Sequence, residues 1–213
     1  MTSNPSISQL EALAAIDSHF KGLIARKTVT NYDEFVSQLN SDIESGISGL
    51  QHNRHQFQHP HWGEDPITCN LITHLNALGY DAEHDTQHGG HCDILVKNPL
   101  QRFEWIGEAK LWKGPDYIRG GLEQLLTRYA SGTINENRGG VLVYVKQPNA
   151  LKKLQTWKSV LTSLDNTISV SDDQHNPLRM DSNHLHLGSG QNYSIRHFFV
   201  ALNHATSTEP EYD

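Results

Sequence analysis

The sequence predicts an α/β protein with a mixed central sheet, helices on both faces and a helical hairpin at its N-terminus. Apolar residues recur at helical spacing through the first fifty residues. Short runs rich in β-branched and aromatic residues follow from residue 80 onward, and helical patterns separate the later runs. A chain of 213 residues with 36% hydrophobic side chains is long enough to bury its own core.

The first fifty residues are expected to form two helices. The first ends before Thr28 and carries one apolar stripe, formed by Leu10, Leu13, Phe20 and Ile24. The second starts at Asn31, where Glu34 follows at capping-box spacing. Its stripe consists of Phe35, Leu39, Ile43, Ile47 and Leu50. The apolar face of this hairpin must be buried, either within its own domain or against a second copy.

The remaining elements are expected in the order of an α/β core. A third helix begins near Asp65 with Pro66 in its first turn and stops at Gly79. Later elements are strands over 80–84, 93–96 and 103–110, a helix over 116–130, a buried strand over 141–145, a helix capped by Asn149, a polar surface loop over 171–180, and strands over 184–187 and 195–202. We therefore expect a helical hairpin and His-rich linker over 1–61, a core over 62–205 and a disordered tail over 206–213.

The charge is distributed unevenly. Residues 1–88 carry 4 basic and 11 acidic side chains, residues 89–146 carry 8 and 6, and residues 147–213 carry 5 and 7, which gives −7, +2 and −2. Because phosphate neutralisation supplies most non-specific affinity for nucleic acid, so acidic a chain would need metal ions, an oligomer or a partner to act on it.

Location is expected to be cytoplasmic, without a membrane contact. The N-terminus lacks the basic region and apolar stretch of a secretory signal. No apolar run approaches the roughly 20 residues that cross a bilayer. Two cysteines, Cys69 and Cys92, are too few for a disulfide framework.

The candidate chemistry lies at Asp93 and at Glu108-Ala109-Lys110. Side chains at i and i+2 of a strand share a face, so Glu108 and Lys110 point together. Antiparallel pairing across the Asn98-Pro99 turn can bring Asp93 beside Glu108. Such carboxylates suit a hard divalent cation, and a nearby lysine can orient a water molecule. A surface ion-pair cluster is the alternative reading of the same residues.

The motifs GGHCDILV, EWIGEAK, QLLTRY and VLVYV occur in an order that resembles the PD-(D/E)XK, or restriction-endonuclease-like, nuclease superfamily over residues 62–146. The resemblance implies a restriction-endonuclease-like fold, with Asp93 and Glu108 as ligands of Mg²⁺ (or Mn²⁺) and Lys110 as the water-activating lysine. It also implies roles for Glu64 in the metal shell, for Gln124 beside Lys110 and for the Ala109 carbonyl as a further ligand. The sequence departs from the family in two places: His91-Cys92 stands where a proline is usual, and Glu64 precedes Pro66 instead of lying within a helix, which leaves Asp65 as its rival.

The helix over 116–130 carries a second stripe beside its apolar one, formed by Tyr117, Gly121, Gln124 and Arg128. A glycine on this shoulder would let the helix approach the carboxylates. Basic residues here supply much of the positive charge of the middle segment and are candidate phosphate contacts, together with Tyr117: Lys113, Arg119 and Arg128. A plain amphipathic helix with a solvated shoulder is the alternative.

Histidines offer a competing metal reading. Zinc ligands are conceivable at His84, His88, His91 and Cys92, although their spacing matches no closed template. A second group, His52, His55, His59 and His61, reads as a polar linker.

Together these features predict a Mg²⁺-dependent endonuclease that hydrolyses phosphodiester bonds, with DNA favoured over RNA. The resemblance implies a regulated effector in defence against phage or foreign DNA, working as a homo-oligomer or with a partner protein. Two alternatives stay open: a catalytically silent subunit of a larger complex that keeps the nuclease fold, and a DNA-repair nuclease.

Overall fold

The computed structural model describes residues 4–84, 86–87 and 91–204. Its helices are α1 (Ile7–Ile16), α2 (Ser18–Lys27), α3 (Tyr32–His52), the 3-10 turn η1 (Arg54–Phe57), α4 (Asp65–Ala77), α5 (Pro115–Gln124), the π-helical turn η2 (Leu125–Tyr129) and α6 (Ala150–Thr162). Its strands are β1 (Asp81–Glu83), β2 (Thr86–Gln87), β3 (His91–Cys92), β4 (Ile94–Asn98), β5 (Phe103–Leu111), β6 (Arg138–Val145), β7 (Thr167–Asp172), β8 (Arg179–Leu185) and β9 (Asn192–Ala201). No described helix combines the length and apolarity needed to cross a bilayer.

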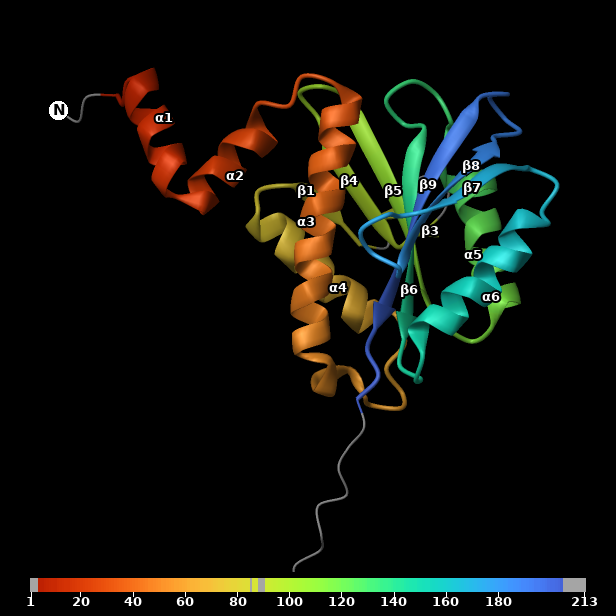
Figure 1. The fold of residues 1–213 in the computed structure, drawn as a ribbon. Helices are drawn as coiled ribbons and strands as arrows, with labels where there is room; N and C mark the ends of the chain where they lie inside the picture. The colour runs from red at the N-terminus through yellow and green to blue at the C-terminus, as the bar shows by residue number, and fades with distance from the viewer. Residues whose placement is uncertain (1–3, 85, 88–90, 205–213) are drawn as a thin grey trace, which may run out of the picture.

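Seven strands form one mixed sheet in the order β1-β4-β5-β6-β9-β8-β7 (Figure 1). The central pairs β5–β6 and β6–β9 are parallel, and the outer pairs are antiparallel. The parallel pair β5–β6 needs a crossover, which α5 and η2 supply. The short strands β2 and β3 pair separately. The expected α/β class with a mixed sheet is therefore confirmed.

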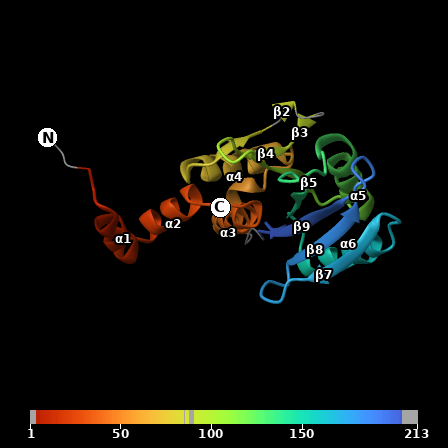
Figure 2. The same ribbon diagram turned by 90° about the horizontal axis from the view of Figure 1, so that it is seen from above.

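Helices cover both faces of the sheet, as expected. Figures 1 and 2 show α3 and α4 on one face and α5 and α6 on the other. Alternation along β5 explains the two cores: Trp105 and Ala109 join the apolar cluster beneath α3 and α4, whereas Ile106 joins the cluster beneath α5, η2 and α6. The sheet is thus a platform with a buried layer on either side.

Local signals place several helix ends where the sequence predicts them. The Asn31 side chain accepts a hydrogen bond from the Glu34 amide at 2.9 Å and caps α3, and Asn149 accepts one from the Lys152 amide at 3.0 Å and caps α6. Gly79, just past α4, has φ +90°, a conformation that favours glycine.

The N-terminal half of the expected hairpin is wrong. In place of one long helix the chain forms α1 and α2, because the Asp17 side chain accepts hydrogen bonds from the amides of His19 and Phe20 and starts a new helix. Neither α1 nor α2 has a buried residue within the described chain, whereas α3 packs fully into the core shared with α4 and the sheet. The boundary expected at residue 62 falls in the segment between η1 and α4.

The expected surface loop over 171–180 is confirmed only over 173–178, and both of its ends belong to strands. Residues up to Asp172 complete β7 and residues from Arg179 begin β8, which pair in antiparallel fashion. The ends of these strands are difficult to predict from the sequence because their residues there are mostly polar. β7 forms the edge of the sheet, and most of its residues are exposed. The expected disordered tail over 206–213 lies outside the described residues.

Candidate active site

Strand β5 carries the two central residues of the site. Glu108 and Lys110 share the face that α5 covers, while Ala109 lies between them on the opposite face, in the core beneath α3 and α4. β5 pairs with β4 so that Gly107 lies opposite Ile94, which places Asp93 at the end of this ladder, next to Glu108. The pairing across the Asn98-Pro99 turn therefore brings the predicted residues together.

Three charged side chains meet at this point. The Lys110 Nζ lies 2.5 Å from Glu108 Oε1 and 3.6 Å from Asp93 Oδ2. Asp93 Oδ2 also accepts a hydrogen bond from the Ala109 amide at 2.8 Å, which fixes the Asp93 side chain against β5. Residues that are fifteen positions apart in the sequence thus form one cluster.

Burial makes this cluster electrostatically unusual. Glu108 is only 1% exposed, and its Oε2 is buried with no hydrogen-bond partner among the described residues. Burial, followed by repulsion from Asp93, raises the pKa of Glu108 to about 7 despite the contact with Lys110. Burial also raises the pKa of Asp93, and the charge of Lys110 opposes this rise. Burial alone would lower the pKa of Lys110, but Glu108 and Asp93 outweigh it and raise that pKa.

Helix α5 closes over the cluster at Gly121. A β-carbon at this position would lie 3.1 Å from Glu108 Cγ and 3.1 Å from Lys110 Cε, closer than most real contacts, so the absence of a side chain at Gly121 favours this close approach. Gln124 lies one turn further along the same helix and is half-buried. The shoulder predicted from the sequence therefore faces the carboxylates at Gly121.

The π-helical turn η2 changes the second half of this shoulder. A π turn contains more residues per turn than an α-helix, so the residues in and after η2 no longer follow the 3.6-residue period, and Arg128 is exposed to solvent. Tyr129 is instead buried, and burial followed by the charges of Glu108 and Asp93 raises its pKa. Sequence reasoning assigned Tyr129 only to the apolar stripe, because a regular helical period conceals the π turn.

Glu64 lies at the edge of the same site. It directly precedes α4 and is half-buried, and its Oε1 accepts a hydrogen bond from the Tyr117 hydroxyl at 3.0 Å. Its negative charge contributes to the raised pKa values of Asp93 and Glu108. Its rival Asp65 is exposed, with Oδ1 3.9 Å from His84 Nε2. Of the two candidates, Glu64 is therefore the one whose charge acts on Asp93 and Glu108.

The predicted phosphate contacts are all exposed. The Lys113 Nζ lies 4.5 Å from the centre of the Tyr117 ring, over its face. Arg119 forms an ion pair with Glu123 at 3.2 Å, one turn along α5, so part of its charge is already balanced. Lys113 with Tyr117 is thus the pair that connects directly to Glu64.

Trp62 is a residue that the sequence reasoning missed. It is 40% exposed and lies two residues before Glu64, and the Lys146 Nζ donates to its carbonyl oxygen at 3.0 Å. Its ring lies 6.0 Å from that of His59. A tryptophan within a polar, His-rich segment is the signal that could have indicated it, since exposed aromatic rings can stack on bases.

Metal ligands are present only in part. Asp93 and Glu108 offer hard oxygen donors, and the unpartnered Glu108 Oε2 is an atom that a cation would satisfy. Over the described residues, however, no three His, Cys, Asp or Glu side chains gather into a group that could hold a metal ion. The zinc reading draws no support from this set; His88 lies outside it, as does the side chain of His91.

Comparison of the sequence with family models and with curated proteins, and of the chain with solved structures, finds no match.

Proposed function

We propose that the chain is a metal-dependent nuclease of the PD-(D/E)XK, restriction-endonuclease-like type, with DNA as the favoured substrate. One observation carries this proposal: Lys110 bridges Asp93 and Glu108, while the second oxygen of Glu108 is buried without a partner. Leaving a buried carboxylate oxygen unsatisfied is costly, and such arrangements gather at sites of chemistry.

Asp93 and Glu108 would hold Mg²⁺, or Mn²⁺ in its place, with the Ala109 carbonyl and Glu64 as the further ligands. A bound divalent ion supplies positive charge that polarises the phosphate and favours ionisation of water. The Tyr117 hydroxyl positions Glu64 at the rim of the site through its hydrogen bond. Asp93 is positioned by the Ala109 amide.

Lys110 would orient the attacking water and neutralise charge that develops at the phosphorus. Its ammonium is held within reach of both carboxylates and is shielded by α5, where electrostatic interactions are stronger than in water. Gln124, one turn beyond Gly121, would orient Lys110 or the water. Tyr129 adds a buried hydroxyl close enough to sense both carboxylates.

The substrate would approach along the exposed side of α5. Lys113, Arg119 and Arg128 supply phosphate contacts there, with Tyr117 beside Lys113. The chain as a whole is acidic, and its net charge of −7 disfavours a standing complex with DNA. We therefore propose that the nuclease is a regulated effector, for example in defence against phage or foreign DNA, that works through assembly or a partner.

A catalytically silent nuclease fold is the second candidate. The observation that favours it is the absence of a third metal-ligating side chain beside Asp93 and Glu108 among the described residues. In that case Lys110 would only neutralise two carboxylates in a structural or binding subunit.

A cleavage assay separates the two functions. The purified full chain is incubated with plasmid, linear DNA and RNA, each with Mg²⁺, Mn²⁺ or a chelator. The nuclease proposal predicts cleavage that the chelator abolishes and that Lys110→Met removes. Lys158→Met is the matched control, because it removes an ammonium that pairs with Asp172 at 2.6 Å on the exposed surface. Absence of cleavage with both metals, together with absence of Mn²⁺ binding, would favour the silent fold, because a nuclease that awaits a partner would still bind the ion.

A further inference from the structure

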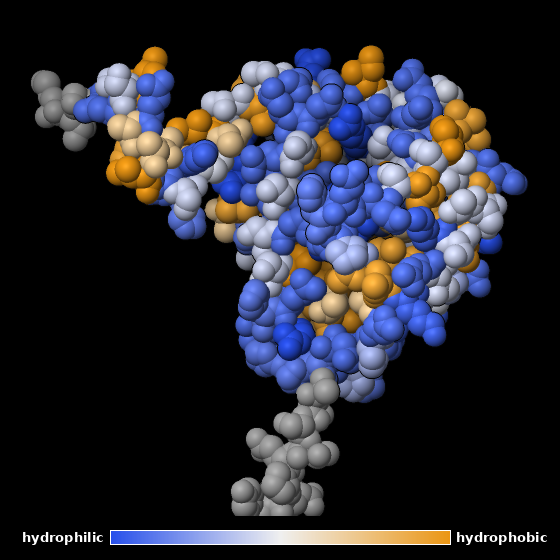
Figure 3. Space-filling model, in the orientation of Figure 1, coloured by the Kyte–Doolittle hydropathy of each residue, from blue (hydrophilic) through white to orange (hydrophobic). Residues whose placement is uncertain are grey.

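The helices α1 and α2, which we call the arm, extend away from the rest of the chain. Figures 1 and 2 both show α1 beyond the end of the body, with α2 as its neighbour among the described elements. Large apolar side chains of the arm are open to solvent: Ile7 is 74%, Leu13 44%, Ile16 84% and Leu23 42% exposed. Figure 3 shows apolar surface, in orange, over this part of the chain.

Such an arm is not stable by itself in water. Each helix has ten residues, and isolated helices shorter than about 12–15 residues are marginal. Seven of the ten residues of α1 are apolar, and they occur around its whole circumference. A helix that is apolar all round belongs inside a packed assembly. The apolar side chains of the arm therefore need a packing partner, and the described part of the same chain does not provide one.

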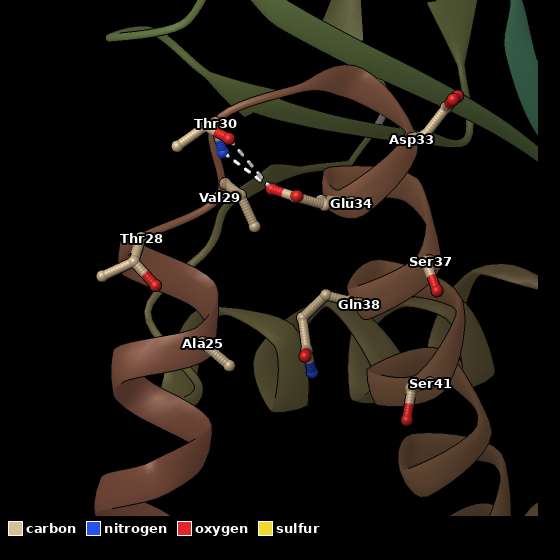
Figure 4. Close-up of a pocket in the computed structure, with 9 residues that line it drawn as sticks. All are labelled: Ala25, Thr28, Val29, Thr30, Asp33, Glu34, Ser37, Gln38 and Ser41. Atoms are coloured by element: carbon tan, nitrogen blue, oxygen red, sulfur yellow. Dashed lines mark hydrogen bonds between the residues drawn. The ribbon is translucent and has the colours of Figure 1, made fainter. Parts of the chain in front are cut away.

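The body cannot provide this packing partner by folding the arm back. A groove of ≈ 960 Å³ separates α2 from α3, and Figure 4 shows which side chains line it. On α3 these are polar or acidic: Asp33, Glu34, Ser37, Gln38 and Ser41. An apolar helix laid into this groove would bury carboxylates and hydroxyls without partners, which is unfavourable.

The end of α2 is nevertheless fixed to the body. Arg26 donates two hydrogen bonds to Asp42, at 2.8 and 2.9 Å, and the Lys27 Nζ donates to the Gly79 carbonyl at 2.8 Å. These contacts hold the last turn of α2 in place while α1 remains outside. The arm is thus anchored at one end and presents its apolar surface outward.

We propose that the arm pairs with the arm of a second copy of this chain, in a two-fold symmetric contact of four helices. The charges of the arm favour a second copy over other occupants. Arg26 and Lys27 are already engaged with the body, which leaves exposed Glu11 and Asp17 against exposed Lys21. So small a net charge suits neither nucleic acid nor a strongly charged protein.

The same charges are self-complementary. Glu11 lies on α1 and Lys21 on α2, so a two-fold axis that sets α1 against the partner's α2 brings opposite charges together twice. An isologous contact requires this property, because each residue pair occurs in both directions. The apolar side chains of α1 would then lie at the centre of the four helices. This pairing is independent of the proposed nuclease activity.

Sedimentation velocity of the full chain over a range of micromolar concentrations tests the pairing. We expect a dimer for the natural sequence and a monomer for the double variant Leu13→Glu/Ile16→Glu. Leu100→Glu and Leu187→Glu are matched controls, because these leucines are 86% and 76% exposed on the body, and both variants should remain dimeric. Circular dichroism should report an intact body in the arm variant, since the arm buries no side chain of its own.

A charge exchange tests the orientation of the helices. Glu11→Lys and Lys21→Glu should each weaken the dimer several-fold, and the two changes combined should restore it. A natural chain that is monomeric at every concentration would overturn the proposal, as would an arm variant that dimerises like the natural chain. Open-ended or higher assembly would overturn the two-fold arrangement, and a combined exchange that does not restore the dimer would overturn the α1–α2 pairing.

Discussion

Glu108 and Arg179 are two buried charges on the same sheet, 1% and 2% exposed, with opposite surroundings. The Arg179 Nε and Nη2 donate to the two oxygens of Glu44 at 2.6 and 2.7 Å. Its Nη1 donates to the carbonyls of Leu178 and Phe199 at 2.9 and 2.8 Å. Glu108 contacts one ammonium, and its second oxygen has no hydrogen-bond partner within the described chain.

The difference shows how to distinguish a structural charge from a functional one. A buried ion stabilises a fold only when good geometry and further hydrogen bonds offset its desolvation. Arg179 meets this condition through a forked pair with Glu44 that joins α3 to β8. Glu108 does not, since Asp93 repels it and Lys110 satisfies only one of its oxygens. The cluster of Asp93, Glu108 and Lys110, in which one oxygen lacks a partner, is therefore the one that we expect to have a catalytic role.

The largest expected effect is on activity at Glu108. Glu108→Gln keeps the shape of the side chain and removes its charge, so we expect cleavage to fall by at least ~10³-fold, as for loss of a main charge-stabilising group. Thermal stability should stay the same or rise, because a repelling buried carboxylate has been removed. Cleavage rates and thermal unfolding of the same preparations check both statements. A fully active, natively folded Glu108→Gln chain would remove this site from the account.

Removing the ion pair between Arg179 and Glu44 should lower stability and leave activity unchanged, the reverse of the effect at Glu108. Arg179→Met removes the forked pair and leaves Glu44 alone, and we expect a loss of about 3 kcal/mol in the free energy of unfolding, near the low end for buried pairs because Glu44 is partly exposed. For a chain of this size, this corresponds to roughly 6–12 °C in Tm. Cleavage per folded molecule should not change. A loss of turnover at an unchanged Tm would contradict the structural assignment of Arg179.

Gln124 is the next side chain whose removal we expect to lower activity without lowering stability. Gln124→Ala should lower turnover by about 10–1,000-fold, the range for one positioning hydrogen bond, and should leave metal binding intact. Gly121→Leu should impair turnover as well, by pushing α5 away from Glu108 and Lys110. The matched control is Glu123→Ala, which loses only its exposed pair with Arg119. Equal turnover in Gln124→Ala and the control would limit the site to Asp93, Glu108 and Lys110.

A third buried polar group consists of neutral side chains that hydrogen-bond to one another. Trp157 Nε1 donates to His197 Nδ1, which leaves His197 Nε2 to donate to Ser182 Oγ, and the Ser182 hydroxyl can donate to His184 Nε2. Both imidazoles are therefore neutral. Burial lowers the pKa of His197 to about 3, with His184 adding to this effect, and burial lowers the pKa of His184 to about 4.

These two histidines contribute a loss of stability in acid, which the raised pKa of Glu108 opposes in part because it acts with the opposite sign. The unfolded chain protonates them near pH 6.5, whereas the folded chain keeps them neutral down to about pH 4. Their contribution is complete above pH 6.5 and falls as the pH drops, by about 1 kcal/mol per histidine between pH 6.5 and 5.5. Denaturant unfolding at several pH values measures this slope. His197→Phe should reduce it, whereas exposed His52→Ala should leave it unchanged.

The convergence of the charged residues could be predicted from the sequence because it rests on local rules. The two-residue period of β5 sets Glu108 and Lys110 on one face, and the Asn98-Pro99 turn returns β5 alongside β4. Gly121 was predicted as the point of helix approach, and the structure confirms it.

Three other features could not be predicted from the spacing of residues in the sequence. The π turn at 125–129 breaks the helical period, and Tyr129 within it is buried where the charges of Glu108 and Asp93 raise its pKa. Strand β7 lies at an edge of the sheet, so most of its residues are exposed, and its short alternation of polar residues with Ile168 and Val170 does not mark a buried strand. The separation of α1 from α2 depends on a single capping residue, Asp17.

Binding of Mn²⁺ to the purified chain, followed by electron paramagnetic resonance, is the decisive measurement for a metal site at Asp93 and Glu108, because it reports on the carboxylates without requiring a substrate. We expect that the natural chain binds Mn²⁺, that Glu108→Gln abolishes or greatly weakens this binding, and that Lys158→Met and Arg179→Met keep it. Absence of Mn²⁺ binding by the natural chain, or undiminished binding by Glu108→Gln, would contradict this expectation.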